Sequence, residues 1–162
     1  MKINLQYFPQ HTATSCGPAC LRMVFSHLGI QYSEEKLIRL CKTTANGTSH
    51  EHLLDEIKRE GLSFEAKSHG TIKQLVMYID NGYPVIINYC EPFSDEGHYA
   101  VVSGYDAKEE LLILADPCNG NDFCIFWDEF ISRWHNENNS SKGWYVVVGR
   151  EGIVVKQSEN TN

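Results

Sequence analysis

The segment QHTATSCGPACLRMVF, residues 10–25, places a cysteine, a glycine and a proline at the start of an apolar run. The apolar positions of this run repeat at the three, four and seven spacing of one helix face: Cys20, Leu21, Val24, Phe25 and Leu28. Such a repeat is typical of an amphipathic helix, and Gly29 follows it as a stop signal. We therefore predict a helix that begins close to Cys16.

The place of Cys16 at the start of this helix indicates chemistry rather than packing alone. A thiol attacks well only as a thiolate, and the free N–H groups and positive dipole end of a helix amino terminus stabilise a thiolate. Gly17 allows a tight turn into the helix, and Pro18 suits the first turn, where its missing N–H costs nothing. Cys20 lies one turn further on, where we expect an inert core residue. Cys16 is thus a candidate nucleophile.

Three more helices are predicted in the first half of the chain. Ser33 is expected to cap a short helix with Glu34 and Glu35 in its first turn. In TSHEHLLDEIKREG, residues 48–61, Thr48 and Glu51 suggest a capping box, and the glycine that ends this segment is a stop signal. TIKQLVMYIDNG, residues 71–82, predicts a further helix that ends at Asn-Gly.

Beyond Gly82 the sequence is rich in β-branched and aromatic residues, which favour strands. Four strands are expected within residues 84–89, 98–106, 111–117 and 143–150, and a short helix at 127–135 interrupts them. Helices first and an antiparallel sheet later predict an α+β fold, with the sheet packed against the helical half. We expect one domain over residues 1–150 and a polar tail over 151–162, of which KQSENTN should be unfolded.

A base and an orienting group for the thiol are found at two strand ends. His98 opens the strand HYAVVSGYD, and Asp116 closes the strand LLILADP. If Tyr105 pairs with Glu109 across a tight hairpin, paired residue numbers sum to 214, which sets His98 directly opposite Asp116. Directly opposed residues share a face of the sheet. This register predicts a His–Asp pair at one edge.

Attack on a carbonyl also needs donors for the oxyanion that develops. The backbone N–H of Cys16 can supply one donor, and the side-chain amide of Gln10, six residues upstream, can supply the other. Gln10 joins Cys16, His98 and Asp116 as the predicted catalytic set.

Charge and composition exclude several other classes of protein. A net charge of −7 without clustered Lys and Arg argues against nucleic acid as a partner. We see neither an apolar segment of signal-peptide length nor one of ~20 residues that could insert in a membrane, so we expect a cytoplasmic protein. The six cysteines should then be free thiols, most of them buried, and their spacings match no zinc site. No cofactor and no metal are implied.

The motifs CGPACLRMVF with Gln10 six residues upstream of the cysteine, GHYAVVSGYD and LILADP resemble the papain-like cysteine peptidase family of bacteriocin-processing leader peptidases and their free-standing relatives. These peptidases cut after double-glycine leaders. The resemblance covers roughly residues 5–148 and implies a papain-like fold with Cys16 as nucleophile, His98 as base, Asp116 as orienting residue and Gln10 as oxyanion donor. Exporter-fused members usually carry Asp before the cysteine, where this chain has Ser15.

Three activities fit the predicted set. A cysteine peptidase would hydrolyse a peptide bond through a thioester, possibly after a glycine-rich leader, with a peptide or protein as substrate. An acyl transferase would use the same residues with an amine as acceptor, and a leader-peptide-binding module would bind without cleaving. A separate peptide transporter as a partner has no support in the sequence. The other histidines, including His11 and His50, are interpreted as surface or loop residues.

Overall fold

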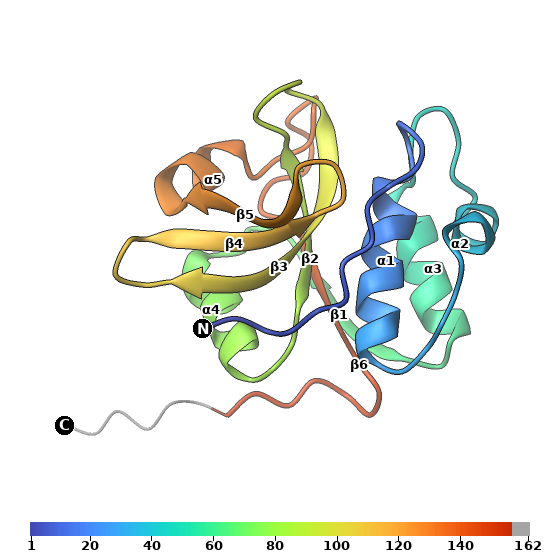
Figure 1. The fold of residues 1–162 in the computed structure, drawn as a ribbon, viewed down its shortest axis with the longest axis horizontal. Coiled ribbons are helices and arrows are strands. Elements are labelled where there is room, and N and C mark those ends of the chain that lie inside the picture. The colour runs from blue at the N-terminus through green and yellow to red at the C-terminus, as the bar shows by residue number, and fades with distance from the viewer. Residues whose placement is uncertain (157–162) are drawn as a thin grey trace.

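The computed structural model describes residues 1–156, and the end of the predicted polar tail, residues 157–162, lies outside that part. Six strands form one antiparallel sheet in the order β1-β6-β2-β3-β4-β5 (Figure 1). The strands are β1 Ser63–Lys67, β2 Val85–Cys90, β3 Gly97–Asp106, β4 Leu111–Asp116, β5 Gly120–Phe126 and β6 Tyr145–Gly149. The helices are α1 Cys16–His27, α2 Glu34–Leu40, α3 His50–Arg59, α4 Ile72–Asp80 and α5 Trp127–Arg133. The predicted α+β fold is confirmed.

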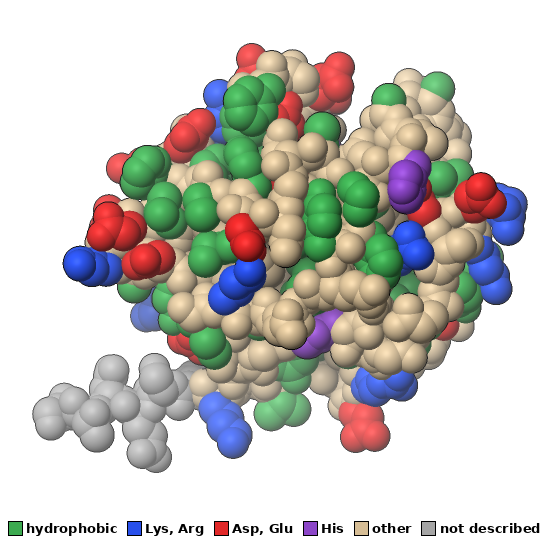
Figure 2. Space-filling view, viewed as in Figure 1, with side chains coloured by type: hydrophobic (Ala, Val, Ile, Leu, Met, Phe, Trp, Pro, Cys, Tyr) green, Lys and Arg blue, Asp and Glu red, His purple; other side chains and the backbone are tan. Residues whose placement is uncertain are grey.

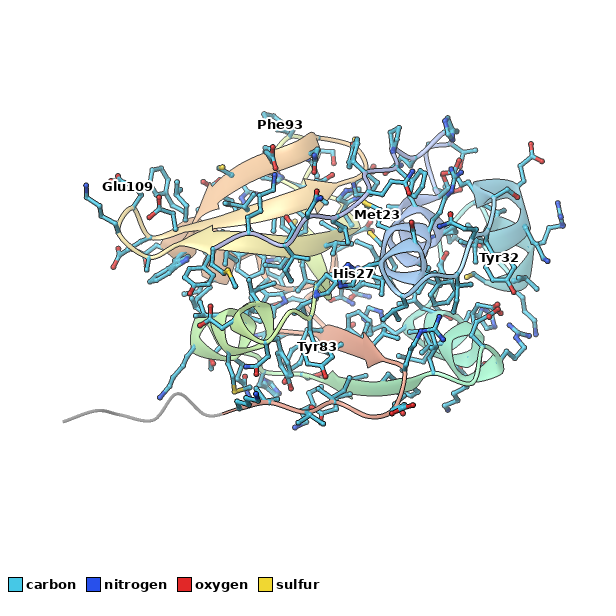
Figure 3. The ribbon with its side chains drawn as sticks, turned by 60° about the horizontal axis from the view of Figure 1, so that its bottom comes forward. Met23, His27, Tyr32, Tyr83, Phe93 and Glu109 are labelled. Atoms are coloured by element: carbon cyan, nitrogen blue, oxygen red, sulfur yellow. The ribbon has the colours of Figure 1, made fainter. Side chains whose placement is uncertain are left out.

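Helices cover both faces of the sheet, which divides the core in two. α1, α2 and α3 pack on one face, where side chains such as Met23 and Val101 are fully buried. α4 and α5 pack on the opposite face, against residues such as Val102 and Leu114. Figure 3 shows Met23 on the side of α1 that faces the strands, whereas Phe93 in the β2–β3 loop points outward and is 79% exposed. The prediction packed the sheet against the helical half and did not divide the helices between two faces.

The helices begin and end close to the predicted residues. α1 begins at Cys16, and the Ser33 side chain caps α2 by accepting a hydrogen bond from the backbone N–H of Lys36. The capping box predicted for Thr48 and Glu51 is wrong, because Ser49 is the N-cap of α3 and accepts from the N–H of His52. A capping box does form at the start of α4, between Thr71 and Gln74.

Two edge strands were absent from the sequence prediction. β1 pairs with β6, and β5 pairs with β4. Most side chains of β1 and β5 are only partly buried or exposed, and β5 contains Gly120 and Asp122 near its start. Polar edge strands give a weak hydrophobic pattern, which is why the prediction stopped at four strands.

The predicted register between β3 and β4 is also wrong. Val101 pairs with Ala115 and Val102 with Leu114, so that paired numbers sum to 216 rather than 214. A bulge at Ser103 then shifts the sum to 217, with Gly104 opposite Ile113. His98 and Asp116 are therefore not directly opposed, but the even error of two leaves both on the predicted shared face.

The amino-terminal segment runs across the molecule from the β3–β4 side to the start of α1 (Figure 1). The backbone N–H of Ile3 donates to Ser103 O at 2.7 Å, and that of Gln10 donates to Pro117 O at 3.0 Å. This second bond ties the loop that carries Gln10 to the end of β4. At the other end, residues 151–156 lie along α4, where the N–H of Lys156 donates to Asn81 Oδ1. No helix within residues 1–156 is long and apolar enough to span a membrane.

Candidate active site

Cys16 is the first residue of α1, and Ser15 is its N-cap. The Cys16 side chain is half-buried, whereas Cys20 one turn later is fully buried, and burial raises the pKa of the Cys20 thiol. Gly17 is needed for close approach: a Cβ there would lie 3.0 Å from Thr48 Oγ1 and 3.1 Å from Thr48 Cβ. Of the six cysteines, Cys118 and Cys124 are exposed, contrary to the prediction that most are buried, and all six are free thiols.

His98 and Asp116 are in direct contact at the end of β3 and β4. Nε2 of His98 lies 2.8 Å from Oδ1 of Asp116, and both side chains are at least nine-tenths buried. The Tyr89 hydroxyl donates to Oδ2 of Asp116 at 2.6 Å, and the backbone N–H groups of Cys118 and Asn119 donate to Oδ1, each at 2.9 Å. The carboxylate therefore has four donors in the folded chain.

Two opposing effects set the protonation of this pair. Burial raises the pKa of Asp116, but its hydrogen bonds with His98 and Tyr89 and the His98 charge bring that pKa below its ordinary value. Burial lowers the pKa of His98, but the hydrogen bonds with Asp116 and Cys16 and their charges raise it to about 10. Burial also raises the pKa of Tyr89, so its hydroxyl remains a donor. Together these effects favour a protonated His98 beside the Asp116 carboxylate.

Gln10 lies in the loop before α1. This loop packs beside the turn that follows β4, where the Gln10 N–H donates to Pro117 O. Its Nε2 donates to Thr12 O at 2.9 Å, while its Oε1 is buried without a partner among residues 1–156. An amide nitrogen carries two hydrogens, so one N–H of Gln10 remains for a ligand. The loop brings this group to the same end of the sheet as Asp116.

A buried carboxylate behind this loop was missed in the sequence. Glu34, at the start of α2, is only 6% exposed. It accepts hydrogen bonds from the His11 N–H at 3.0 Å, from His11 Nδ1 at 2.5 Å and from Ser15 Oγ at 2.8 Å. The sequence interpretation placed Glu34 in the first turn of a helix, where it lies, and His11 in a surface or loop position. It did not predict that the two residues together fix the segment between Gln10 and Cys16.

A pocket of about 340 Å³ opens beside Cys16, in the notch between the two halves of the molecule (Figure 2). Its walls come from the α2–α3 loop, the start of α3, the β2 and β3 strands and the loop before β6: Cys16, Asn46, Gly47, Thr48, Ser49, His50, Asn88, Gly97, Tyr99, Asn136, Glu137 and Asn138. The loop before β6 is held in place where Glu137 Oε1 accepts from the Gly97 N–H at 2.9 Å.

His50 lines this pocket, contrary to its interpretation as a surface residue. Its ring stacks on Trp144 with centroids 3.9 Å apart, and its Nδ1 lies 2.6 Å from the Tyr99 hydroxyl. Because Tyr99 donates its own hydrogen to Thr48 O, Nδ1 of His50 must be the donor in their contact. Burial lowers the pKa of His50 to about 4, so the ring is neutral at pH 7. The sequence pattern around His50 could not show this, since its partners Tyr99 and Trp144 come from two distant segments.

An antiparallel sheet with a cysteine at the start of the first helix and a His–Asp pair on two central strands is the arrangement of the papain-like cysteine peptidase fold. The model of the C39-like peptidase family matches residues 2–142, and the chain belongs to this family. The resemblance found in the sequence is thereby confirmed.

Individual proteins and a solved structure are also similar to the chain. A protein of Methanothermobacter thermautotrophicus described as uncharacterized is 31% identical over 111 residues, which are 68% of this chain and 70% of that protein. The transport and processing ATP-binding protein ComA of Streptococcus pneumoniae is 32% identical over 117 residues, 70% of this chain but 15% of ComA. The crystal structure of the peptidase domain of Streptococcus ComA, a bifunctional ABC transporter involved in quorum sensing, superposes with a TM-score of 0.72 at 28% identity and covers 91% of this chain and all of that domain.

Proposed function

We propose that the chain is a cysteine peptidase in which Cys16 attacks a peptide carbonyl and water resolves the thioester. The observation that carries this proposal is the contact between Nε2 of His98 and Oδ1 of Asp116, at 2.8 Å, and Cys16 is a further group that raises the pKa of the same imidazole. An imidazolium beside the sulfur stabilises the thiolate and can then protonate the leaving amine.

The remaining residues of the predicted set have complementary roles in this mechanism. Asp116 orients the imidazole and stabilises its charge, since its carboxylate is itself fixed by Tyr89 and two backbone N–H groups. Gln10 and the backbone N–H of Cys16 donate to the oxyanion of both tetrahedral intermediates. In this proposal the chemistry is carried by side chains, one backbone N–H group and water.

The substrate we favour is a peptide with a glycine-rich leader. A structure of a double glycine motif protease from a peptide transporter, bound to a leader peptide, shares this fold with a TM-score of 0.68 at 18% identity. A peptide substrate also fits the open pocket that adjoins Cys16. A separate transporter as partner is part of the same hypothesis.

The test is cleavage of synthetic peptides with a Gly-Gly junction, followed by mass spectrometry, with and without added amines. A peptidase gives products that carry one added water, whereas an acyl transferase gives the acceptor's mass on the amino-terminal fragment. Cys16→Ala should abolish turnover, and Cys124→Ala, which removes an exposed thiol, should leave it unchanged. Binding of the peptide without cleavage by the unmodified protein would instead support a binding module.

A further inference from the structure

Asn88 of β2 is buried at the floor of the pocket beside Cys16 without the hydrogen bonds that a buried amide needs. The residue is 8% exposed, and its Oδ1 is fully buried with no partner among residues 1–156. An unsatisfied buried polar group costs about 1–3 kcal/mol, and native proteins contain few of them. Such a group in a pocket wall points to a ligand that completes it.

Aromatic side chains lie beside Asn88. It pairs with Tyr99 on β3, and the Tyr99 ring meets the Trp144 ring edge-on at 5.9 Å. His50 stacks on Trp144 and gives its one N–H to Tyr99, so none of these rings satisfies the amide. A hydrogen bond made between such aromatic walls is stronger than one made in water.

The chemistry of the ligand follows from the chemistry of a carboxamide. Asn88 offers one acceptor and two donors, and rotation about its Cβ–Cγ bond can present either atom to the pocket. The complementary partner is another amide, which carries a C=O and an N–H side by side. Glu137 is the single carboxylate among the pocket residues, at its outer side, and it is already engaged by Gly97.

We propose that Asn88 is a substrate-binding residue that pairs with a backbone amide of the bound peptide, a few residues from the scissile bond. The inference rests on the proposed function for the identity of the ligand as a peptide. It adds a specific contact: Asn88 binds the main chain of the peptide, in a pocket whose other lining residues include the rings of His50 and Tyr99.

Asn88→Leu separates this role from a structural one, because leucine has the same number and branching of side-chain heavy atoms as asparagine and no polar atoms. If the Asn88 amide is unsatisfied until a ligand binds, it destabilises the unliganded protein. Its removal should then raise the midpoint of thermal unfolding by roughly 2–4 °C. The same change should weaken peptide binding about fivefold to tenfold. A residue with a merely structural role would not give stabilisation together with loss of affinity.

Asn81→Leu is the matched control, since the Asn81 amide is satisfied on both atoms: Nδ2 donates to Met77 O at 2.8 Å and Oδ1 accepts from the Lys156 N–H at 2.9 Å. This variant should lower the unfolding midpoint and leave peptide affinity unchanged. Binding is measured in the Cys16→Ala background by NMR titration of ¹⁵N-labelled protein with N-acetyl-diglycine N-methylamide. The backbone N–H signals of the pocket residues are followed in every variant, and the Asn88 side-chain NH₂ signals in the proteins that keep Asn88.

The outcomes separate this inference from the proposed function. The inference is overturned if Asn88→Leu lowers the unfolding midpoint, or if it leaves the affinity for the blocked diglycine unchanged. The backbone amides of the peptide are also methylated one at a time. Methylation at one position should weaken binding to the protein that keeps Asn88, and methylation at no position should weaken binding to the Asn88→Leu variant. The inference is also overturned if binding depends on an Asn or Gln side chain of the peptide rather than on its backbone amides. Absence of cleavage with binding intact would count against the peptidase alone.

Discussion

Nε2 of His98 and Oδ1 of Asp116 are 2.8 Å apart, and they meet along a diagonal of the sheet. The pairing of Val101 with Ala115 and Val102 with Leu114 continues to Ala100 opposite Asp116, two residues along β3 from His98. Residues two apart on a strand share a face, and diagonal neighbours are within reach of long side chains. The contact therefore depends on side-chain reach, and the donors around Asp116 hold its carboxylate at the required position.

Asp116→Asn should reduce peptide turnover by about 10²–10⁴-fold, because an amide neither fixes the imidazole tautomer nor stabilises its charge. It should also destabilise the fold by about 3–5 kcal/mol, since it leaves the buried His98 without its counter-charge. Cleavage rates and urea unfolding measure the two effects. Asp122→Asn is the control, because Asp122 is half-exposed and its loss should change neither quantity by more than about 0.5 kcal/mol. Turnover within tenfold of the unmodified protein would refute the orienting role.

The pKa of His98, raised to about 10, predicts how Cys16 reacts with pH. A base whose pKa is raised in the folded chain binds its proton more tightly there, and its contribution to stability is complete below pH ~6.5 and lost as pH rises through 10. Imidazolium is thus present at pH 6 and keeps the adjacent sulfur reactive. Iodoacetamide should then label Cys16 at pH 6 at least about tenfold faster than the exposed Cys124.

His98→Ala should abolish this advantage at pH 6, and peptide mass spectrometry locates the labelled cysteine in both proteins. Cys124 serves as an internal reference in the same chain. Equal labelling of Cys16 and Cys124 at pH 6 would contradict the ion pair and would favour the binding module over the peptidase.

The strongest sequence signals in this chain are local ones. The 3.6-residue repeat and the Gly-Pro start placed α1 at Cys16, and β-branched runs placed four strands, because both patterns reflect burial on one or two faces. The β3–β4 register failed at the hairpin, where Tyr105 pairs with Leu112 rather than with Glu109, so that paired numbers sum to 217. The bulge at Ser103 then brings the sum to 216, and the amino-terminal segment packs closely beside it, since a Cβ at Gly104 would lie 2.6 Å from Met1 O.

The residues of the candidate site also fall into two groups, those marked by local sequence signals and those whose roles depend on tertiary packing. Cys16, His98, Asp116 and Gln10 could be proposed from sequence because motifs and strand ends mark them. Three further residues, Glu34, His50 and Asn88, could not, since each acquires its role from groups brought together only by the fold. In the sequence a buried glutamate and a solvated one are identical.

Gln10→Ala should lower turnover by about 10²–10³-fold and change KM by no more than a few-fold, because an oxyanion donor acts mainly in the transition state. Steady-state cleavage kinetics give both constants. Gln6→Ala removes an exposed amide of the same loop, whose Oε1 accepts from Ser26 Oγ, and should leave them unchanged. A rise in KM at constant kcat would show that Gln10 binds the ground state instead.

Glu34→Ala should loosen the loop between Gln10 and Cys16, since it leaves His11 and Ser15 without their common acceptor. We expect a loss of about 1–3 kcal/mol in the free energy of unfolding and a lower kcat. Glu35→Ala, at the exposed next position of α2, is the control for both measurements. If the two variants unfold at the same urea concentration, the carboxylate of Glu34 does not organise this loop.

His50 should make the fold sensitive to mild acid, because burial lowers its pKa to about 4. The unfolded chain takes up a proton at this residue below pH ~6.5, whereas the folded chain resists until pH 4, so stability falls as pH drops between these values. With allowance for its partial exposure to solvent, the loss is on the order of 1–2 kcal/mol. Urea unfolding of the unmodified protein and of His50→Phe, which can still stack on Trp144, should differ in slope over this interval and run parallel above pH 7. Parallel curves throughout would mean that the His50 ring is as accessible to protons in the folded chain as in the unfolded one.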